Sequence, residues 1–455
     1  MDSFAIRNFG CRVNQAEAFA WAEELQRRGL RLETDPARSG IVVVNSCTLT
    51  GRADRDVRKF VRRILRENPG ARLVVTGCLA ERDPGGFDSL PGVWKVVPNG
   101  AKASLPDLLA PAGRFAAGDE PAVGARSFRA RAMLKVQDGC DRACCFCVIP
   151  SVRGRSVSLP LAAAVDRARA FAAQGFKEIV LTGIHLCSWG QDLEPRRTLA
   201  DLLAAVAAAP GDFRVRLSSL DPRLMPAPLV DLLVSSPRIC PHFHLSLQHA
   251  SAGILRAMGR NSTPGEYREI LAALHRKAPE AALGADVIVG FPGETEEDFR
   301  ELEAFLTAAP LAYIHVFAYS PRPGTAAEGE TGVPSRIKAG RAIRLRRLSK
   351  EKWTAYREAF VGRVLDGIVV RAGRPEAEVL TSNYIDVRAP GEGAARGSAV
   401  RVKITRVADG AAVVAPEAHA APPCGTAEVA PKAHAAPPCA AAFGEIVGDG
   451  PGGRS

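Results

Sequence analysis

The sequence predicts an α/β protein built from three parts, and three observations support this. Buried-strand runs alternate with helical patterns within residues 1–112, which predicts a parallel α/β domain. Six more strand-and-helix units occupy residues 126–352 and predict a partial parallel (β/α)6 barrel. Short alternating strands over residues 353–415 predict a small β-barrel, and the Ala- and Pro-rich residues 416–455 predict a disordered tail.

The first part shows its strands and helices in turn. Residues 3–9 predict a short strand, and a helical pattern follows over residues 15–29. The continuous apolar runs at residues 40–45 and 72–76 are typical of strands buried on both faces of a parallel sheet. A second helical pattern, over residues 54–67, separates these two runs. This alternation predicts a parallel α/β sheet.

A cysteine follows each of these three strands: Cys11, Cys47 and Cys78. The carboxyl ends of parallel strands lie at one edge of a sheet, where ligands bind. Cysteines are also common as small core residues. Three cysteines that each follow a strand indicate a metal site, in which the three thiols meet at this edge.

The second part contains six strand patterns with helical patterns between them. The strands are expected at residues 132–136, 178–182, 214–218, 242–247, 284–289 and 313–318. The helices are expected at residues 161–174, 198–208, 264–277 and 296–308. This spacing favours a partial barrel over a flat sheet, and such barrels carry their chemistry at the carboxyl ends of the strands.

The last part follows a basic run. Residues 336–352 contain eight Lys or Arg and one acidic residue, which suits either a solvated helix face or a contact with nucleic acid. Strands of the small barrel are expected at residues 367–371, 378–380, 385–388, 399–406 and 411–414. The sequence VAPEAHAAPPC of residues 414–424 returns with one change at residues 429–439; each copy offers a His and a Cys, but the composition favours a disordered tail.

Composition narrows the function. The chain of 455 residues is 47% hydrophobic with a net charge of +11, which is globular and permits a polyanionic partner. We expect neither a membrane helix nor a signal peptide, because the apolar stretches are short and no basic region precedes one at the N-terminus. An odd number of cysteines, 11, favours metal or redox chemistry over disulfides.

The most specific signal is the spacing of Cys140, Cys144 and Cys147, which gives CxxxCxxC directly after a strand. Three closely spaced soft sulfur donors suit a cubane iron–sulfur cluster and leave its fourth iron open to an external ligand. Cys145 also lies within the motif. A set of three ligands that used Cys145 would have only one residue between Cys145 and Cys147, so we interpret Cys145 as a bystander that does not bind the cluster.

This motif after the first strand of a six-unit barrel resembles the radical S-adenosylmethionine enzymes. Other segments that fit this superfamily are residues 181–185 (LTGIH), 244–248 (HLSLQ) and 286–294 (DVIVGFPGE). The N-terminal cysteines narrow the resemblance to the methylthiotransferases. The motifs concerned are residues 8–15 (NFGCRVNQ), 45–48 (NSCT), 76–78 (TGC), 315–320 (HVFAYS) and 322–327 (RPGTAA).

Within this family, the residues after Cys11 are most similar to the branch that acts on N6-threonylcarbamoyladenosine in tRNA. The resemblance implies a cluster-binding domain at 1–112, a radical barrel at 126–352 and an RNA-binding TRAM module at 353–415. It also implies a tRNA substrate, a reductant such as a flavodoxin or ferredoxin, and a cytoplasmic location without a membrane.

The resemblance further implies two 4Fe-4S clusters. The cluster on Cys140, Cys144 and Cys147 binds S-adenosylmethionine and cleaves it to a radical that removes hydrogen from C2 of the adenine. The cluster on Cys11, Cys47 and Cys78 delivers sulfur, which a second S-adenosylmethionine methylates.

Three alternatives remain open. The same chemistry could act on isopentenyladenosine in tRNA or on an aspartate of a ribosomal protein. A non-catalytic RNA-binding protein with structural metal sites is a third reading, but structural sites usually have a fourth ligand. A mononuclear metal site at His242, His244 and His249 is disfavoured, because alternating histidines on a strand are typical of packing.

Overall fold

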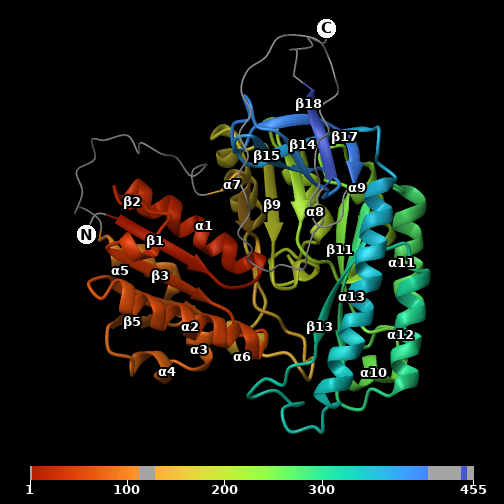
Figure 1. The fold of residues 1–455 in the computed structure, drawn as a ribbon, viewed down its shortest axis with the longest axis horizontal. Helices are drawn as coiled ribbons and strands as arrows, with labels where there is room; N and C mark the ends of the chain where they lie inside the picture. The colour runs from red at the N-terminus through yellow and green to blue at the C-terminus, as the bar shows by residue number, and fades with distance from the viewer. Residues whose placement is uncertain (1–2, 112–128, 408–441, 448–455) are drawn as a thin grey trace.

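The computed structural model describes residues 3–111, 129–407 and 442–447, and it confirms the predicted α/β fold class (Figure 1). The N-terminal unit is a five-stranded parallel sheet with the strand order β2-β1-β3-β4-β5. Its elements are β1 (Ser3–Asn8), α1 (Arg12–Arg27), β2 (Arg31–Leu32), η1 (Pro36–Arg38), β3 (Ile41–Ser46), α2 (Gly51–Glu67), β4 (Arg72–Gly77), α3 (Cys78–Arg82), α4 (Gly85–Asp88), β5 (Val93–Val97), η2 (Asn99–Ser104) and α5 (Leu105–Leu109).

Helices cover both faces of this sheet, which is why its central strands are continuously apolar. Successive residues of β3 point to opposite faces. Val43 packs with Trp21 and Leu25 on the α1 side, whereas Val42 packs with Val57 and Val61 on the α2 side. The two apolar layers fix the sheet and so fix the positions of the loops at its carboxyl edge.

The second unit contains all six predicted strands, with ends within two residues of the prediction. Its main elements are β6 (Ala132–Lys135), α7 (Leu161–Ala173), β9 (Glu178–Thr182), α8 (Leu199–Ala208), β10 (Arg214–Leu217), α9 (Ala227–Ser235), β11 (His242–Gln248), α11 (Pro264–Lys277), β12 (Ala282–Val289), α12 (Glu296–Ala308), β13 (Tyr313–Ala318) and α13 (Ser335–Glu358). Its shorter elements are β7 (Gln137–Asp138), α6 (Ile149–Arg153), β8 (Val157–Ser158), η4 (Leu186–Ser188), η5 (Pro222–Leu224) and α10 (Ala252–Ala257).

These strands form two three-stranded parallel sheets, β10-β9-β6 and β11-β12-β13, which join into one arc. The junction is made by main-chain hydrogen bonds: Leu220 N–H donates to the carbonyl of His244 (2.8 Å), and Ser246 N–H donates to the carbonyl of Leu220 (2.9 Å). Strands β6 and β13 therefore lie at the two ends of the arc. This is the predicted partial barrel.

The N-terminal unit packs against the β6 end of the arc, and α1 lies beside it (Figure 1). On α1, Phe19 makes edge contacts with Phe171 and Phe176 of the barrel, with ring centroids 5.6 and 5.7 Å apart. These aromatic rings belong to the main core of the barrel. The contact joins the two units through a shared apolar layer, so their cysteine loops keep a fixed relation.

The C-terminal unit is a closed barrel in the order β14-β15-β16-β18-β17. Its strands are β14 (Val364–Arg371), β15 (Glu376–Thr381), β16 (Asp386–Pro390), β17 (Ala399–Val407) and β18 (Ala442–Val447). The fifth strand differs from the one expected at residues 411–414. It is formed by residues 442–447, whose composition predicts part of a disordered tail. It pairs with both β16 and β17 and so satisfies two strand edges that would otherwise stay open.

Some expectations concern residues outside the described ranges. The Ala-, Gly- and Pro-rich composition of residues 111–127 predicts a linker, of which only the first residue is described. The strand expected at 411–414 and the repeated His and Cys residues of the tail also lie outside the described ranges. Among the described residues, no helix is both long enough and apolar enough to cross a membrane.

A buried carboxylate ties the strands of the barrel together. Glu178, at the start of β9, is fully buried and accepts hydrogen bonds from Arg216 Nε (2.7 Å), Arg214 Nε (3.0 Å) and Arg131 Nη1 (3.1 Å). Although burial opposes its ionisation, these guanidinium groups hold the pKa of Glu178 well below its usual range.

The same cluster docks the C-terminal barrel. Arg216 also donates to the main-chain carbonyls of Thr381 and Ser382, at 3.0 and 3.1 Å. Beside it, the ring of Tyr384 stacks on His242 with centroids 3.8 Å apart. Because Arg216 is itself fully buried, loss of its counter-charge would affect both units.

We expect Glu178→Gln to lower the free energy of unfolding by about 3–5 kcal/mol, because it leaves buried cations unpaired. Urea unfolding at neutral pH measures this change. The lowered pKa stabilises the fold above the unfolded-state pKa of about 4.3, and this stabilisation is lost as the pH falls below it. As a control, Glu378→Gln removes an exposed pair with Arg371 and should change stability by about 1 kcal/mol or less. Equal effects of the two changes would contradict the prediction.

Candidate functional site between the two cysteine sets

The N-terminal cysteines lie at the carboxyl edge of the five-stranded sheet. Cys11 follows β1, Cys47 follows β3, and Cys78 begins α3 directly after β4. Burial raises the pKa of the Cys47 thiol to about 12, and repulsion from Cys11 and Cys78 contributes to this rise. The structure therefore brings the three thiols within interacting distance of one another.

Gly10 makes room for this arrangement. Its φ of +148° lies in the region that favours glycine, and a Cβ there would lie 2.9 Å from the Cβ and 3.3 Å from the Sγ of Cys47. A side chain at residue 10 would therefore push Cys47 out of the set. This close approach fits a site built to gather soft sulfur donors.

The second cysteine set lies on the loop between β7 and α6. Cys140, Cys144 and Cys147 all line one cavity. Burial raises the pKa of Cys147 to about 12, with further repulsion from the other two thiols. Cys145 is not part of the cavity wall, and its Sγ donates to the carbonyl of Ala257 (3.1 Å). Three sulfurs on one tight loop fit a cubane cluster with one open iron.

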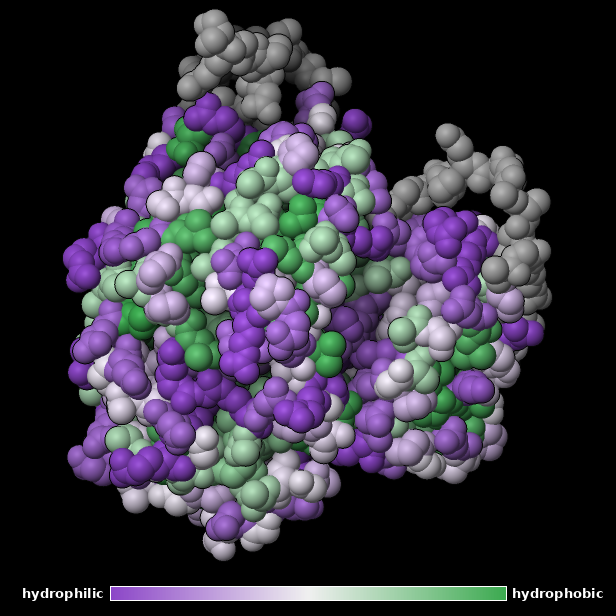
Figure 2. Space-filling model, turned by 180° about the vertical axis from the view of Figure 1, so that it is seen from behind, coloured by the Kyte–Doolittle hydropathy of each residue, from purple (hydrophilic) through white to green (hydrophobic). Residues whose placement is uncertain are grey.

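The cavity beside the second cysteine set has a volume of about 260 Å³. Leu49 and Thr50, which follow Cys47, form part of its wall, and the carboxyl ends of the barrel strands form the rest. From behind, hydrophilic residues gather in the furrow where the N-terminal unit meets the rest of the molecule (Figure 2). A substrate in this cavity would contact both units.

Arg153 reaches from the barrel to the N-terminal cysteine set. It ends α6, just after the second cysteine loop, yet its Nε lies 3.3 Å from the Sγ of Cys78. The guanidinium is buried and also donates to Asn14 (2.7 Å), Asp138 (2.8 Å) and Glu17 (3.0 Å). Its positive charge opposes the rise that burial causes in the pKa of the Cys11 thiol. No signal in the sequence pairs residues 75 positions apart, so sequence analysis missed it.

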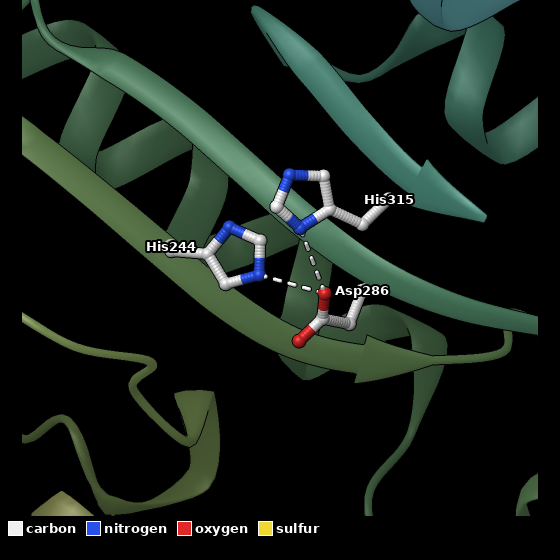
Figure 3. A group of neighbouring side chains, drawn as sticks. All are labelled: His244, Asp286 and His315. Atoms are coloured by element: carbon white, nitrogen blue, oxygen red, sulfur yellow. Dashed lines mark hydrogen bonds and ion pairs between the residues drawn. The ribbon is translucent and has the colours of Figure 1, made fainter. Parts of the chain in front are cut away.

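A histidine and aspartate group forms another part of the barrel interior (Figure 3). Asp286 Oδ1 lies 2.9 Å from His244 Nε2 and 3.2 Å from His315 Nδ1. Although burial opposes ionisation, these histidines hold the pKa of Asp286 below its usual range. The Tyr313 hydroxyl lies 2.9 Å from His244 Nδ1 and 2.7 Å from His242 Nε2. Hydrogen bonds thus explain the group, and they place an ionised Asp286 on the cavity wall.

The packing interpretation of the histidines therefore needs one addition. His242 and His249 are buried, as expected of packing residues, and His249 Nε2 lies 3.7 Å from Glu294. The residue that lies with His244 at Asp286 is His315, and not His242 or His249. The sequence analysis did not consider His315 as a partner. The strands that carry His244, Asp286 and His315 are neighbours only in the folded sheet, in the order β11-β12-β13.

The basic run lies on α13, and part of it is used within the protein. Arg341 is buried and donates to Glu294 Oε1 (2.7 Å), and Arg344 pairs with Glu303. Lys352 donates to main-chain carbonyls at the end of α12. These cations fasten α13 to the barrel, so the run is not simply a solvated face.

Two family models match the chain. The model of the Radical SAM superfamily matches residues 134–306, and the model described as Uncharacterized protein family UPF0004 matches residues 3–97. The first spans the barrel with the Cys140 loop, and the second spans the N-terminal sheet with the other three cysteines.

Several curated relatives cover most of the chain. Threonylcarbamoyladenosine tRNA methylthiotransferase MtaB of Aquifex aeolicus is 36% identical over 85% of this chain and 96% of the relative. The protein of the same name from Thermotoga maritima is 33% identical over 80% of this chain and 85% of the relative. Ribosomal protein uS12 methylthiotransferase RimO of Moorella thermoacetica is 31% identical over 89% of this chain and 96% of the relative.

A solved structure supports the fold. The radical S-adenosylmethionine methyltransferase TsrM of Kitasatospora setae has a TM-score of 0.51 and 15% identity, covering 72% of this chain and 77% of that one. At this identity the likeness concerns the fold alone. Together with the relatives above, the comparisons show that the chain belongs to the radical S-adenosylmethionine methylthiotransferase family.

Proposed function

We propose that this protein adds a methylthio group to C2 of N6-threonylcarbamoyladenosine next to the anticodon of tRNA. The observation that carries this proposal is the 36% identity to a threonylcarbamoyladenosine tRNA methylthiotransferase, over 96% of that relative's length. A second candidate substrate is ribosomal protein uS12, because a uS12 methylthiotransferase is 31% identical over 96% of its length.

Two sets of three thiols are proposed to hold the cofactors. Cys140, Cys144 and Cys147 would hold a 4Fe-4S cluster that binds S-adenosylmethionine, and Cys11, Cys47 and Cys78 would hold a second one. The donor chemistry supports this, since three sulfurs leave an iron open for a ligand. The proposed domains are residues 1–112, 126–352 and 353–415, with the strand at 442–447 added to the last.

When bound, the clusters and S-adenosylmethionine supply the radical chemistry and the sulfur, and the protein's own residues supply position and shielding. A substrate in the cavity would contact the second cysteine set directly and would lie beside Leu49 and Thr50, which follow Cys47 of the N-terminal set. Arg153 places a positive charge against Cys78 of the N-terminal set. Contacts with His244 and His315 keep the carboxylate of Asp286 fixed at the cavity. The apolar wall formed by residues such as Phe146 and Ile288 would exclude water.

The proposed partners follow from this chemistry. A flavodoxin or ferredoxin would supply electrons, and the protein would work in the cytoplasm, where tRNA is found. The adenine must leave its stacked position for C2 to reach the cavity. The small barrel and α13 would hold the tRNA backbone.

We expect Arg346→Ala with Arg347→Ala to weaken tRNA binding and to flatten its salt dependence. Both lie on α13 with exposed side chains, and phosphate contacts release counterions. Fluorescence anisotropy with an anticodon stem-loop at several salt concentrations measures the slope, which should change by about one to two units. Arg344→Ala, whose guanidinium already pairs with Glu303, serves as the matched control. An unchanged slope in the double variant would place the tRNA contact elsewhere.

The substrate is tested with the reconstituted protein under anaerobic conditions. We expect a methylthio product, detected by mass spectrometry of nucleosides, on a stem-loop carrying N6-threonylcarbamoyladenosine. A stem-loop carrying isopentenyladenosine and a uS12 peptide should give none. Product on the peptide alone would favour the ribosomal substrate instead.

A further inference from the structure

A buried guanidinium faces the cavity with incomplete hydrogen bonding. Arg322 is 5% exposed and forms part of the cavity wall. Its Nη2 pairs with Asp54, whereas its Nε and Nη1 have no hydrogen-bond partner among the described residues. Burying polar hydrogens without acceptors costs free energy, so this arrangement indicates a place for an acceptor that the protein itself does not provide.

The local charges do not cancel. The carboxylate of Asp54 is shared, because Arg82 Nη2 also donates to it (2.9 Å), as does the hydroxyl of Thr48 (2.8 Å). Two guanidinium groups therefore share one carboxylate, which leaves an excess positive charge. Only Arg322 of these two lines the cavity.

The other cations of the cavity wall are better matched. Arg142 pairs with Asp221 (3.1 Å). Arg260 donates through Nη1 to the carbonyl of Ser246 (2.9 Å), and only its Nε is without a partner among the described residues. Among the described residues of the cavity wall, Arg322 is thus the arginine with two buried donor atoms left without a partner.

Arg322 lies at the junction of the two units. Ser320, two residues before it, accepts a hydrogen bond from the N–H of Gly51 at the start of α2 (3.2 Å). A Cβ on Gly51 would lie 3.6 Å from Arg322 Nη1. The guanidinium therefore lies beside the segment that follows Cys47.

We propose that Arg322 binds the carboxylate of the threonylcarbamoyl group. This inference rests on the proposed function. The substituent carries one carboxylate, and guanidinium is suited to recognising carboxylate through charge-assisted hydrogen bonds. An isopentenyl group has no charge to offer, and it would leave the buried donors unpaired.

The test compares two synthetic anticodon stem-loops on the reconstituted protein. One carries N6-threonylcarbamoyladenosine, and the other carries its threoninamide analogue, in which a neutral amide replaces the carboxylate. For the unchanged protein we expect kcat/KM to be roughly 10- to 100-fold higher, and Kd correspondingly lower, for the carboxylate. In Arg322→Gln the ratios of kcat/KM and of Kd between the two stem-loops should fall to about one. In Arg322→Lys, which keeps the charge but lacks the paired donors of a guanidinium, both ratios should be intermediate.

The matched control is Arg82→Gln, which removes the other guanidinium from Asp54 and should preserve the preference. If Arg322→Gln retains the preference, or loses activity equally on both stem-loops, the guanidinium serves another ligand or only the contact between the units, and the inference is wrong. If the unchanged protein modifies neither stem-loop, the proposed function itself fails and this inference fails with it. Iron content and visible absorption of each variant show whether the clusters are intact.

Discussion

Replacing Cys140, Cys144 and Cys147 together with alanine is expected to halve the bound iron and to abolish cleavage of S-adenosylmethionine. Two cubanes contain about eight irons per chain, and this variant keeps ligands for about four. The fourth iron of this cluster is the proposed site of S-adenosylmethionine, so no other residue set should substitute for it. Iron analysis and the yield of 5′-deoxyadenosine measure the two effects after anaerobic reconstitution.

The neighbouring thiol provides the control for this experiment. Cys145 lies within the same loop but outside the cavity wall, and its Sγ bonds to a carbonyl of α10. Cys145→Ala should therefore keep its iron and its cleavage activity. Full iron loading in the triple variant, or loss of a cluster in Cys145→Ala, would contradict the assignment of ligands.

Replacing Cys11, Cys47 and Cys78 with alanine is expected to separate the two activities. The second cluster and the barrel stay intact, so the variant should still release 5′-deoxyadenosine in the presence of a reductant. It should form no methylthio product, because the proposed source of sulfur is removed. Mass spectrometry of the nucleosides and quantification of 5′-deoxyadenosine test both parts on one sample.

The variant in which alanine replaces Cys140, Cys144 and Cys147 is the reciprocal control. It should lose both the release of 5′-deoxyadenosine and the formation of the methylthio product. A variant of the N-terminal set that still forms the methylthio product would show that these cysteines are structural. The free energy of unfolding should be measured beside activity, because Cys78 is buried against α6.

The sequence by itself determined the cysteine sets and the strands that precede them. Continuous apolar runs reveal strands covered on both faces, and in a parallel sheet all carboxyl ends lie at one edge. It follows that Cys11, Cys47 and Cys78 meet without any knowledge of side-chain packing. The six strands of the barrel were predictable for the same reason, since each is a local pattern.

Local sequence patterns did not predict a strand whose position depends on the strands with which it pairs. The fifth strand of the C-terminal barrel, β18, follows a long segment of Ala and Pro, and its place depends on the open edges of β16 and β17. The composition of residues 416–455 predicts a tail, but it carries no information about unpaired strand edges elsewhere in the fold. Tertiary pairing, rather than propensity, decided that this segment is a strand.

Only the tertiary structure decided which charged groups serve the site. Arg153 reaches Cys78 across 75 residues, and Arg322 reaches Asp54 across 268. Arginine is usually a surface residue, and neither position stands out by hydropathy or spacing. Whether a guanidinium is paired, shared or left with free donors depends on the packing of two units against each other, which is a property of the fold and not of any stretch of sequence.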